Sequence, residues 1–303
     1  MLNVTGFAPH FADLPRHEEA VYSLLQGGLG NLLFQYLTGL SHAEALDVPH
    51  YCVFPSISAH GSTLEALGLK PRYATLPERF ATYVLRGKRR RFTEFKQRFG
   101  SPLPKLVWER GRKPFGIAPK PRKGSLLVGH WQRLENLARI EPHHYLRLTS
   151  LAERGDYETL SILKEPGSVA VHVRRGDYVS NPDANRYHGL IGRAFYDAAR
   201  ELIEQKTSVK HFVVFSDDLD AARQELSNWS NIYFPPRQTQ EVDLAQMSMA
   251  EHAIIANSSF SWWGAYLNQN PNKVVVYPTN WVAARGPEKQ AAGNAIPEDW
   301  VGV

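Results

Sequence analysis

The C-terminal part of the chain repeats one pattern, in which a short and wholly apolar run is followed by an amphipathic stretch with helical spacing. Strands that are apolar throughout are buried on both faces, which is typical of a parallel sheet covered by helices. The pattern therefore predicts a Rossmann-like α/β domain over residues 166–303, with ligands expected at the carboxyl ends of its strands. The runs interpreted as strands are residues 168–174, 211–216, 231–234, 253–256 and 273–278.

The first half of the chain is less regular and is expected to form a separate N-terminal domain over about residues 1–165. An apolar run at 21–25 stops at a glycine-rich turn, and a helical pattern starts at Leu32. A second apolar run, 125–131, also predicts a strand and leads into a mainly helical connection. The stretch between these two features is rich in proline and basic residues, and its pattern assigns no element.

Composition excludes several classes of protein. The sequence contains no run of the roughly 20 apolar residues that a membrane-spanning helix needs. Its first residues lack the basic-then-apolar pattern of a signal peptide. The single cysteine, Cys52, excludes an internal disulfide framework and is interpreted as a buried small side chain. These features predict a cytoplasmic protein.

Positive charge is concentrated in three segments, residues 86–98, 110–113 and 120–123. Such clusters suit anionic partners, which include nucleic acid, lipid headgroups and acidic glycans. A solvated surface that only keeps the protein soluble explains them equally well. No base-reading motif accompanies them, so nucleic acid is not expected as a partner.

The sharpest local feature is the pair Arg174 and Arg175, which follows a predicted strand and precedes Gly176 and Asp177. Guanidinium groups bind phosphate oxygens in bidentate geometry, so the pair indicates an anion site. If the strand continues to its end, the two side chains point to opposite faces, and one binds phosphate while the other supports the loop. An arginine–aspartate ion pair that only closes the loop is the alternative.

A second feature, Asn257-Ser258-Ser259, follows the apolar run 253–256. Ser258 or Ser259 is placed to cap the next helix, whose free N–H groups would attract an anion. Two anion-binding features at adjacent strand ends of one sheet suggest a diphosphate. The tryptophans that follow, Trp262 and Trp263, are expected to pack the helix on the sheet.

Acidic residues offer a third feature. Asp217 and Asp218 follow the run 211–216, and Asp243 lies in a later helix. Paired aspartates are compatible with a divalent metal. A carboxylate also suits the N–H donors of a guanine base, for which Asp243 is a second candidate. A helix cap is the other interpretation, and it is favoured for Asp217.

The fourth feature is the turn Gly27-Gly28-Leu29-Gly30-Asn31 between the first strand and its helix. Glycines let the backbone approach a ligand closely, and the helix N-terminus adds its dipole. The turn lacks the Gly-Lys-Ser/Thr ending of a P-loop and the complete dinucleotide fingerprint, which excludes the ATPase and NAD interpretations.

Across residues 27–268 the chain resembles the α-1,2-fucosyltransferase family in the order and spacing of its motifs. These motifs are GGLGNLLFQY, HVRRGDYV, FSDD and DLAQMSMAEHAIIANSSFSWWGAYLN. The resemblance implies a GT-B-like α/β fold, with two Rossmann-like domains facing across a cleft. It implies transfer of L-fucose from GDP-fucose to an acceptor glycan, at the 2-hydroxyl of a terminal galactose. Inversion at the anomeric carbon is implied as well, with no cofactor and no metal.

The resemblance also implies roles for individual residues. Arg174 and Arg175 would contact the donor diphosphate. The base that accepts the proton of the acceptor is a separate inference from position: Asp177 and His188 both follow the arginines, and Asp177 is preferred because it lies inside the motif. The glycine turn, through Gly28, Gly30 and Asn31, would face the cleft from the acceptor domain. Residues expected on the donor side besides the arginines are His172, Asp218, Asp243, Asn257, Ser258 and Ser259.

The sequence departs from the family pattern at Leu32, where a glutamine is usual, so a contact of that amide would be absent. Ala250, where cysteine is common, is interpreted as a packing change. Charge and family together suggest a lipid-linked acceptor and peripheral contact with an anionic membrane. Three alternatives stay open: a fucosyltransferase of α-1,6 or protein-O linkage, a non-catalytic nucleotide-sugar or glycan-binding protein, and a nucleic-acid binder.

Overall fold

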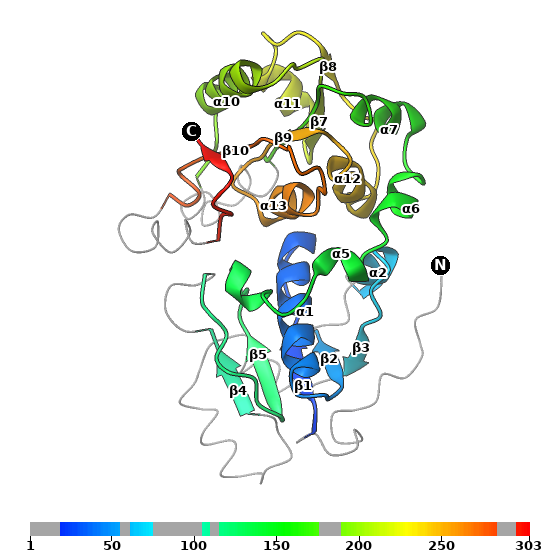
Figure 1. Ribbon diagram of the computed structural model, residues 1–303, viewed down its shortest axis with the longest axis vertical. Coiled ribbons are helices and arrows are strands. Elements are labelled where there is room, and N and C mark those ends of the chain that lie inside the picture. The colour runs from blue at the N-terminus through cyan, green and yellow to red at the C-terminus, as the bar shows by residue number, and fades with distance from the viewer. Residues whose placement is uncertain (1–18, 55–60, 75–104, 110–114, 176–188, 284–294) are drawn as a thin grey trace. The chain divides into compact units, whose positions relative to one another are not determined.

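The computed structural model describes residues 19–54, 61–74, 105–109, 115–175, 189–283 and 295–303. The chain folds into two compact units, unit 1 (Met1–Glu141) and unit 2 (Pro142–Val303). The helical connection 142–163 thus belongs to unit 2, whereas the sequence pattern placed it in the N-terminal domain. Each unit contains one parallel sheet flanked by helices (Figure 1), so both are Rossmann-like α/β units, the composition of a GT-B-like protein.

Unit 2 is built on a six-stranded sheet with the order β11-β10-β9-β6-β7-β8. All of its strand pairs are parallel. The central strand β6 is buried at every position. The bounds are β6 (Ser168–Val173), β7 (His211–Ser216), β8 (Ile232–Tyr233), β9 (His252–Ile254), β10 (Val275–Tyr277) and β11 (Val301–Gly302).

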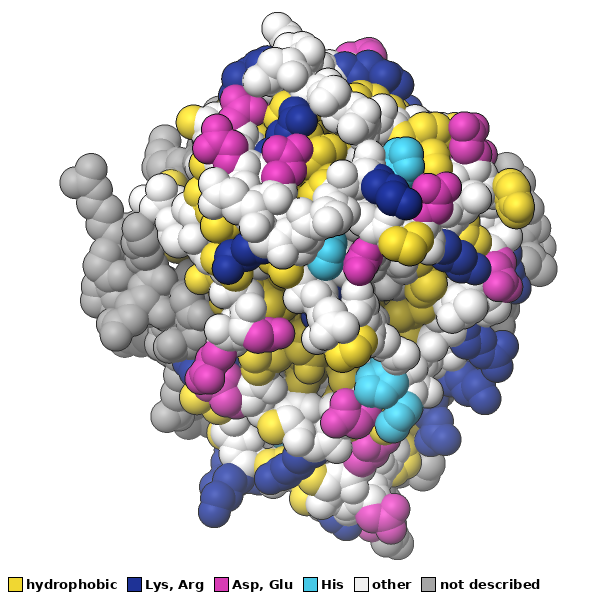
Figure 2. All heavy atoms as spheres, turned by 45° about the horizontal axis from the view of Figure 1, so that its top comes forward, with side chains coloured by type: hydrophobic (Ala, Val, Ile, Leu, Met, Phe, Trp, Pro, Cys, Tyr) yellow, Lys and Arg dark blue, Asp and Glu magenta, His cyan; other side chains and the backbone are white. Residues whose placement is uncertain are grey.

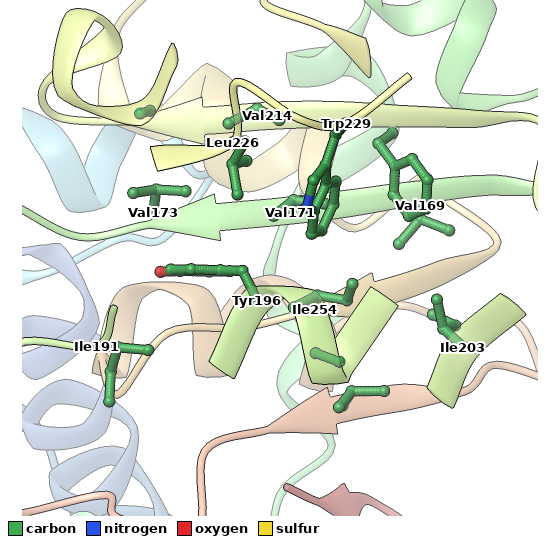
Figure 3. Close-up of a cluster of buried hydrophobic side chains, with 14 residues drawn as sticks. Val169, Val171, Val173, Ile191, Tyr196, Ile203, Val214, Leu226, Trp229 and Ile254 are labelled. Atoms are coloured by element: carbon green, nitrogen blue, oxygen red, sulfur yellow. The ribbon is translucent and has the colours of Figure 1, made fainter. Parts of the chain in front are cut away.

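Helices cover both faces of this sheet. Successive side chains of β6 point to opposite faces, and all of them are buried, so each face packs against helices. On one face, three valines of β6 pack with two residues of α10 and two residues that follow α11 (Figure 3). The valines are Val169, Val171 and Val173, and their partners are Tyr196 and Ile203 of α10, and Leu226 and Trp229 after α11. On the opposite face, Ala170 packs with residues of α7, α12 and α13. The helices of unit 2 are α5 (Pro142–Tyr145), α6 (Leu148–Ala152), α7 (Tyr157–Leu163), α10 (Arg193–Lys206), α11 (Leu219–Glu225), α12 (Gln240–Met247) and α13 (Ser259–Tyr266).

Unit 1 has a five-stranded parallel sheet with the order β3-β2-β1-β5-β4. The long helix α1 (Leu29–Glu44) follows β1 directly and is buried around most of its circumference. The other elements are β1 (Val21–Leu24), β2 (His50–Val53), α2 (Gly61–Ala66), β3 (Arg72–Ala74), β4 (Lys105–Trp108), β5 (Ser125–Val128) and the 3₁₀ turn η3 (Leu134–Asn136).

The strand order reverses once in each sheet. In unit 2 the chain runs from β6 outward to β8, then returns to β9 on the other side of β6 and continues to β11. In unit 1 it runs from β1 to β3 and returns through β4 to β5, which lies beside β1. At such a switch point the two loops at the carboxyl ends diverge, which leaves room for a ligand. The topology thus predicts one ligand-binding position per unit, β6/β9 in unit 2 and β1/β5 in unit 1.

The regular pattern of the C-terminal part predicted its elements correctly, including β7 at residues 211–216. Two expectations were wrong at element ends. Helix α1 begins at Leu29 rather than Leu32, so Gly30 lies inside its first turn. The run 273–278 is not the last strand, because β11 follows at residues 301–302.

Charged side chains of both signs are interspersed on the face shown in Figure 2. Of the basic segments, only 120–123 is described, and its Lys120, Arg122 and Lys123 are exposed. Segments 86–98 and 110–113 lie outside the described residues, so contact with an anionic membrane stays a prediction. No helix in the described part of the chain is long and apolar enough to cross a membrane.

A buried carboxylate, Glu109, holds together the loops that follow β4 and β5. Its side chain is 1% exposed. Its oxygens accept hydrogen bonds from the backbone N–H groups of Gly116 (2.8 Å), His130 (2.8 Å) and Trp131 (3.1 Å). Sequence reasoning missed this role, because Glu109 stands beside a basic segment and resembles a surface residue.

We expect Glu109→Ala to lower the free energy of unfolding by at least about 3 kcal/mol, because three backbone donors lose their acceptor. Urea unfolding measures this change. Glu135→Ala is the matched control, since that side chain is 47% exposed in its pair with Arg133 and exposed pairs contribute about 0–1 kcal/mol. Equal effects of the two substitutions would contradict the role assigned to Glu109.

Candidate functional site

The switch point of unit 2 brings together the loops that follow β6 and β9. These strands are direct neighbours, with Val171 beside Ile254 in the register. Arg174 and Arg175 come after β6, and Asn257 and Ser258 come after β9. The sequence predicted both pairs at adjacent strand ends of one sheet, and the strand order confirms that β6 and β9 are neighbours.

Arg175 is the more buried of the two arginines, with 9% of its surface exposed. Its guanidinium forms an ion pair with Glu225, the last residue of α11. Its backbone N–H donates to Oδ1 of Asp217, at 2.9 Å. The Arg175 side chain therefore links the loop after β6 to the helix that follows β7.

Arg174 lies closer to solvent, with 29% of its side chain exposed. Its Nη1 is 2.8 Å from Oδ2 of Asp217. Asp217 uses Oδ2 for this ion pair and Oδ1 to accept the backbone N–H of Arg175. The same carboxylate therefore fixes the backbone after β6 and orients the guanidinium of Arg174. This arrangement leaves the Arg174 fork at the ligand-facing end of the central strand.

His172 precedes the arginines and is 3% exposed. Burial, together with the charge of Arg174, lowers the pKa of its imidazole to about 3, so the ring is neutral at physiological pH. The ring lies against Phe260, with 5.3 Å between centroids. Its Nδ1 has no hydrogen-bond partner among the described residues, which makes it a buried polar group that a ligand would satisfy.

Ser258 is the N-cap of α13, as expected: its hydroxyl accepts from the N–H of Phe260 at 3.3 Å. Ser259 is the first residue of the helix. Asn257 is 2% exposed and its amide donates to the carbonyl of Gly189 at 3.2 Å. Trp262 and Trp263 are fully buried, which confirms their predicted packing role.

The two aspartates after β7 have separate roles in the structure. Asp218, not Asp217, caps α11, because its Oδ1 accepts from the N–H of Ala221 at 3.0 Å. The interpretation of Asp217 as the helix cap was therefore wrong, and its carboxylate serves the arginines instead. No group of three or more His, Cys, Asp or Glu side chains among the described residues could hold a metal ion.

Asp243 lies in the first turn of α12 and receives a long hydrogen bond from Gln238, at 3.4 Å. Burial, opposed by the Gln238 bond and assisted by the charge of Glu241, raises the pKa of its carboxyl to about 6. Gln238 is itself held by Gln246 and by the backbone N–H of Asp156. Asp243 is therefore a carboxylate in a fixed and partly desolvated position.

In unit 1 the glycine turn leads into α1 at the β1/β5 switch point. Gly28 is the N-cap of the helix, and a Cβ added there would meet no atom within 4 Å. Gly27 has φ +88°, so a side chain there would be strained. Asn31 accepts a hydrogen bond from Gln132 at 2.6 Å. Leu32 is 1% exposed, so the residue that departs from the family pattern packs in the core.

Two predicted residues, Asp177 and His188, lie outside the described part of the chain. Conversely, sequence reasoning missed Glu225 and Tyr196. Tyr196 is fully buried and donates through its hydroxyl to the carbonyl of His172 at 3.1 Å, which anchors the end of β6 to α10. Neither residue belongs to a recognisable motif. Both lie near the arginines only because their helices pack on β6 and β7.

Comparisons with known proteins identify the family of the chain. The sequence profile of glycosyl transferase family 11 matches residues 125–303. An α-1,2-colitosyltransferase of Escherichia coli is 31% identical over 302 residues, which span 93% of this chain and 98% of the relative. The O-antigen biosynthesis glycosyltransferase WbnK of Escherichia coli is 37% identical over 131 residues, 42% of this chain and 43% of the relative.

Among solved structures, fucosyltransferase NodZ from Bradyrhizobium is similar at 11% sequence identity, with a TM-score of 0.46. The match covers 82% of this chain and 92% of that one. The family profile spans more than half of the chain, and the colitosyltransferase is similar over nearly its whole length. The chain therefore belongs to glycosyl transferase family 11.

Proposed function

We propose that this glycosyltransferase transfers L-fucose from GDP-fucose to a hydroxyl of an acceptor glycan, the 2-hydroxyl of a terminal galactose, with inversion and without a metal. The observation that carries the proposal is Arg174. Its guanidinium is held by Asp217 at the end of β6, at the switch point where the capped N-terminus of α13 follows the neighbouring strand. A guanidinium beside a helix N-terminus suits a diphosphate.

In the proposed reaction the acceptor oxygen bonds to the anomeric carbon as the bond from that carbon to the β-phosphate oxygen breaks. The bonding electron pair stays on the departing GDP, so negative charge grows on the β-phosphate. Arg174 stabilises that charge where it develops. Arg175 has a supporting role, because it is the more buried of the two and its guanidinium is paired with the half-buried Glu225. The neutral His172 adds a hydrogen-bonding group beside Arg174 without adding charge.

The proton of the acceptor hydroxyl requires a base. Asp177 remains the proposed base, ahead of His188, because it stands directly after the arginines and Gly176 in the sequence. A base with a pKa near the working pH accepts the proton as the new bond forms.

The donor sugar has a second candidate. The relative that is similar over nearly the whole chain is named an α-1,2-colitosyltransferase. Colitose is L-fucose without its 3-hydroxyl, so the two donors share the diphosphate contacts and differ only in one sugar hydroxyl. Comparing kcat/KM for GDP-fucose and GDP-colitose decides between them.

Thermal stabilisation by nucleotides tests the donor site first. We expect GDP and GDP-fucose to raise the melting temperature and UDP-galactose to leave it unchanged, because a ligand of the native state stabilises it by mass action. GDP-mannose is included to show how much of the effect depends on the sugar. The shift should persist in EDTA. A shift that requires a metal, or no shift with guanine nucleotides, would remove the proposed donor site.

The arginines give a second prediction. Arg174→Ala should lower kcat by about 10²–10³, equivalent to about 2.7–4 kcal/mol of barrier, as for comparable anion-stabilising donors. Its melting temperature should change little, because the side chain is partly exposed. Arg175→Ala should lower both turnover and melting temperature, since it leaves Glu225 without its buried partner.

Arg200→Ala is the matched control for turnover, because Arg200 also pairs with a glutamate, 2.9 Å away, but belongs to α10 and not to the loop after β6. Steady-state kinetics and thermal unfolding of the three variants provide the comparison. Near-full turnover of Arg174→Ala would contradict the mechanism.

A third prediction concerns the guanine base. Its ring and exocyclic N–H groups are donors, and an ionised Asp243 accepts both. Because the pKa of Asp243 is raised to about 6, the carboxyl is protonated below that pH and ionised above it. Affinity for GDP should therefore rise as pH increases through about 6, and this step should be absent in Asp243→Asn.

Isothermal titration between pH 5 and pH 8 measures the GDP affinity. Asp220→Asn, an exposed acid in the first turn of α11, is the control and should retain the step. Retention of the same step in Asp243→Asn would assign guanine recognition to another group.

A further inference from the structure

The chain between β4 and β5 ends in a stretch, residues 115–124, whose only charged side chains are basic. They are Lys120, Arg122 and Lys123. We call this stretch the crossover loop, because a connection between two parallel strands returns from the carboxyl edge of the sheet to its amino edge. The basic residues come at the end of the return, so they lie toward the amino edge and away from the switch point of unit 1.

The end of the crossover loop is joined to the amino edge by its backbone. Gly124 donates its N–H to the carbonyl of Ala20 at 2.8 Å, and its own carbonyl accepts from the N–H of Lys105 at 2.7 Å. Lys105 is the first residue of β4 and its side chain is exposed. The basic surface therefore comprises Lys105, Lys120, Arg122 and Lys123, all four exposed.

Buried polar side chains hold the inner side of the crossover loop. Asn136, which is 4% exposed, accepts from the N–H of Ala118 at 2.7 Å and donates to the carbonyl of Gly116 at 3.0 Å. Nε2 of His42 lies 3.0 Å from the carbonyl oxygen of Pro119. Because the backbone is fixed at these points, the outward side chains are already in place, and binding a partner costs little ordering entropy.

The outer side of the crossover loop exposes an apolar side chain next to the basic ones. Ile117 is 55% exposed. It lies three positions before Lys120, so the two Cα atoms are at most about 11 Å apart. A single exposed isoleucine is ordinary on a protein surface. Beside a row of cations, however, it makes the surface amphipathic.

The four basic side chains have no carboxylate partner among the described residues, and none of them forms a side-chain hydrogen bond there. By contrast, Arg133, Arg174, Arg175 and Arg200 each pair with a carboxylate. Glu44 and Asp47, at and after the end of α1, are exposed in a segment that packs near Ala118. Attraction of an anionic partner therefore depends on the loop's own cations and not on the net charge of the region.

We propose that the crossover loop docks on an anionic lipid surface. The basic side chains contact the headgroup phosphates, and Ile117 enters the boundary between headgroups and acyl chains. The apolar side chain favours lipid over nucleic acid, since a phosphate backbone attracts the same cations but offers no apolar layer. The loop also lacks an exposed aromatic ring for stacking on bases, because Phe115 is 4% exposed. This inference does not depend on which sugars the protein binds.

Flotation of the full chain with vesicles tests the proposal. One set of vesicles consists of phosphatidylcholine, and the other also contains the anionic lipid phosphatidylglycerol. We expect binding to the second set only. The triple substitution Lys120→Gln, Arg122→Gln and Lys123→Gln should weaken it about 100-fold, at about fivefold for each basic residue. Ile117→Ser should weaken it about tenfold, because less apolar surface is buried.

A second triple variant is the matched control. Lys164→Gln, Lys206→Gln and Lys210→Gln remove the same charge from exposed lysines of unit 2 and should leave vesicle binding unchanged. Tyr157→Ser removes another exposed hydrophobic side chain, 84% exposed, and is the control for Ile117→Ser. GDP affinity and melting temperature should stay at the wild-type values in all variants, which separates loss of docking from loss of folding or of the donor site.

A fluorescent label tests the insertion of residue 117 directly. Cys52 is the only cysteine of the chain and is buried, so Ile117→Cys provides one reactive thiol on the surface. A polarity-sensitive fluorophore attached there should shift its emission to shorter wavelengths with phosphatidylglycerol vesicles. The same label at Lys206→Cys should show no shift.

Three results would overturn the proposal. The first is vesicle binding that the loop variants leave unchanged or that both triple variants weaken equally. The second is emission from position 117 that does not respond to anionic vesicles. The third is tighter binding to RNA than to phosphatidylglycerol vesicles, which would assign the basic surface to nucleic acid.

Discussion

The parallel pairing of β6 with β9 is the constraint on which the proposed donor site depends. Their register places Val169 beside His252 and Val171 beside Ile254, so the two strands end at the same edge. The strand order reverses between them, and the chain therefore leaves this edge in opposite directions. Two loops that are about eighty residues apart in the sequence become neighbours for this reason alone. The pairing of β1 with β5 has the same consequence in unit 1.

The two edges differ in how their polar groups are compensated. In unit 2 the buried Arg175 needs Glu225, because a charge removed from water is costly without a partner. The Asp217 carboxylate contacts both arginines: it pairs with the guanidinium of Arg174 and accepts the backbone N–H of Arg175. In unit 1 the compensation is achieved by amides. Gln35 satisfies a backbone N–H and a backbone carbonyl and still reaches His130.

The sequence predicted unit 2 well because its strands are apolar and separated by periodic helices. The same reasoning failed for β2, β3 and β4, whose sequences HYCV, RYA and KLVW are short and mix polar with apolar residues. Motif spacing identified Arg174, Arg175 and the Ser258 cap. It could not identify Glu225 or Tyr196, because a glutamate at a helix end and a tyrosine within a helix gain their contacts with the end of β6 only from the tertiary structure.

The ion pair between Arg174 and Asp217 has a consequence for turnover. In the proposed donor site, a guanidinium that already has a carboxylate partner, 2.8 Å away, would exchange one anion for another on binding a diphosphate. The net gain is smaller than that of a bare cation, since breaking or sharing the pair offsets part of the new contact. A transferase must release its nucleotide product after every cycle. In the proposed site, Asp217 would pair with Arg174 again as the product dissociates. Asp217 would thus limit product inhibition while it holds the empty site in shape.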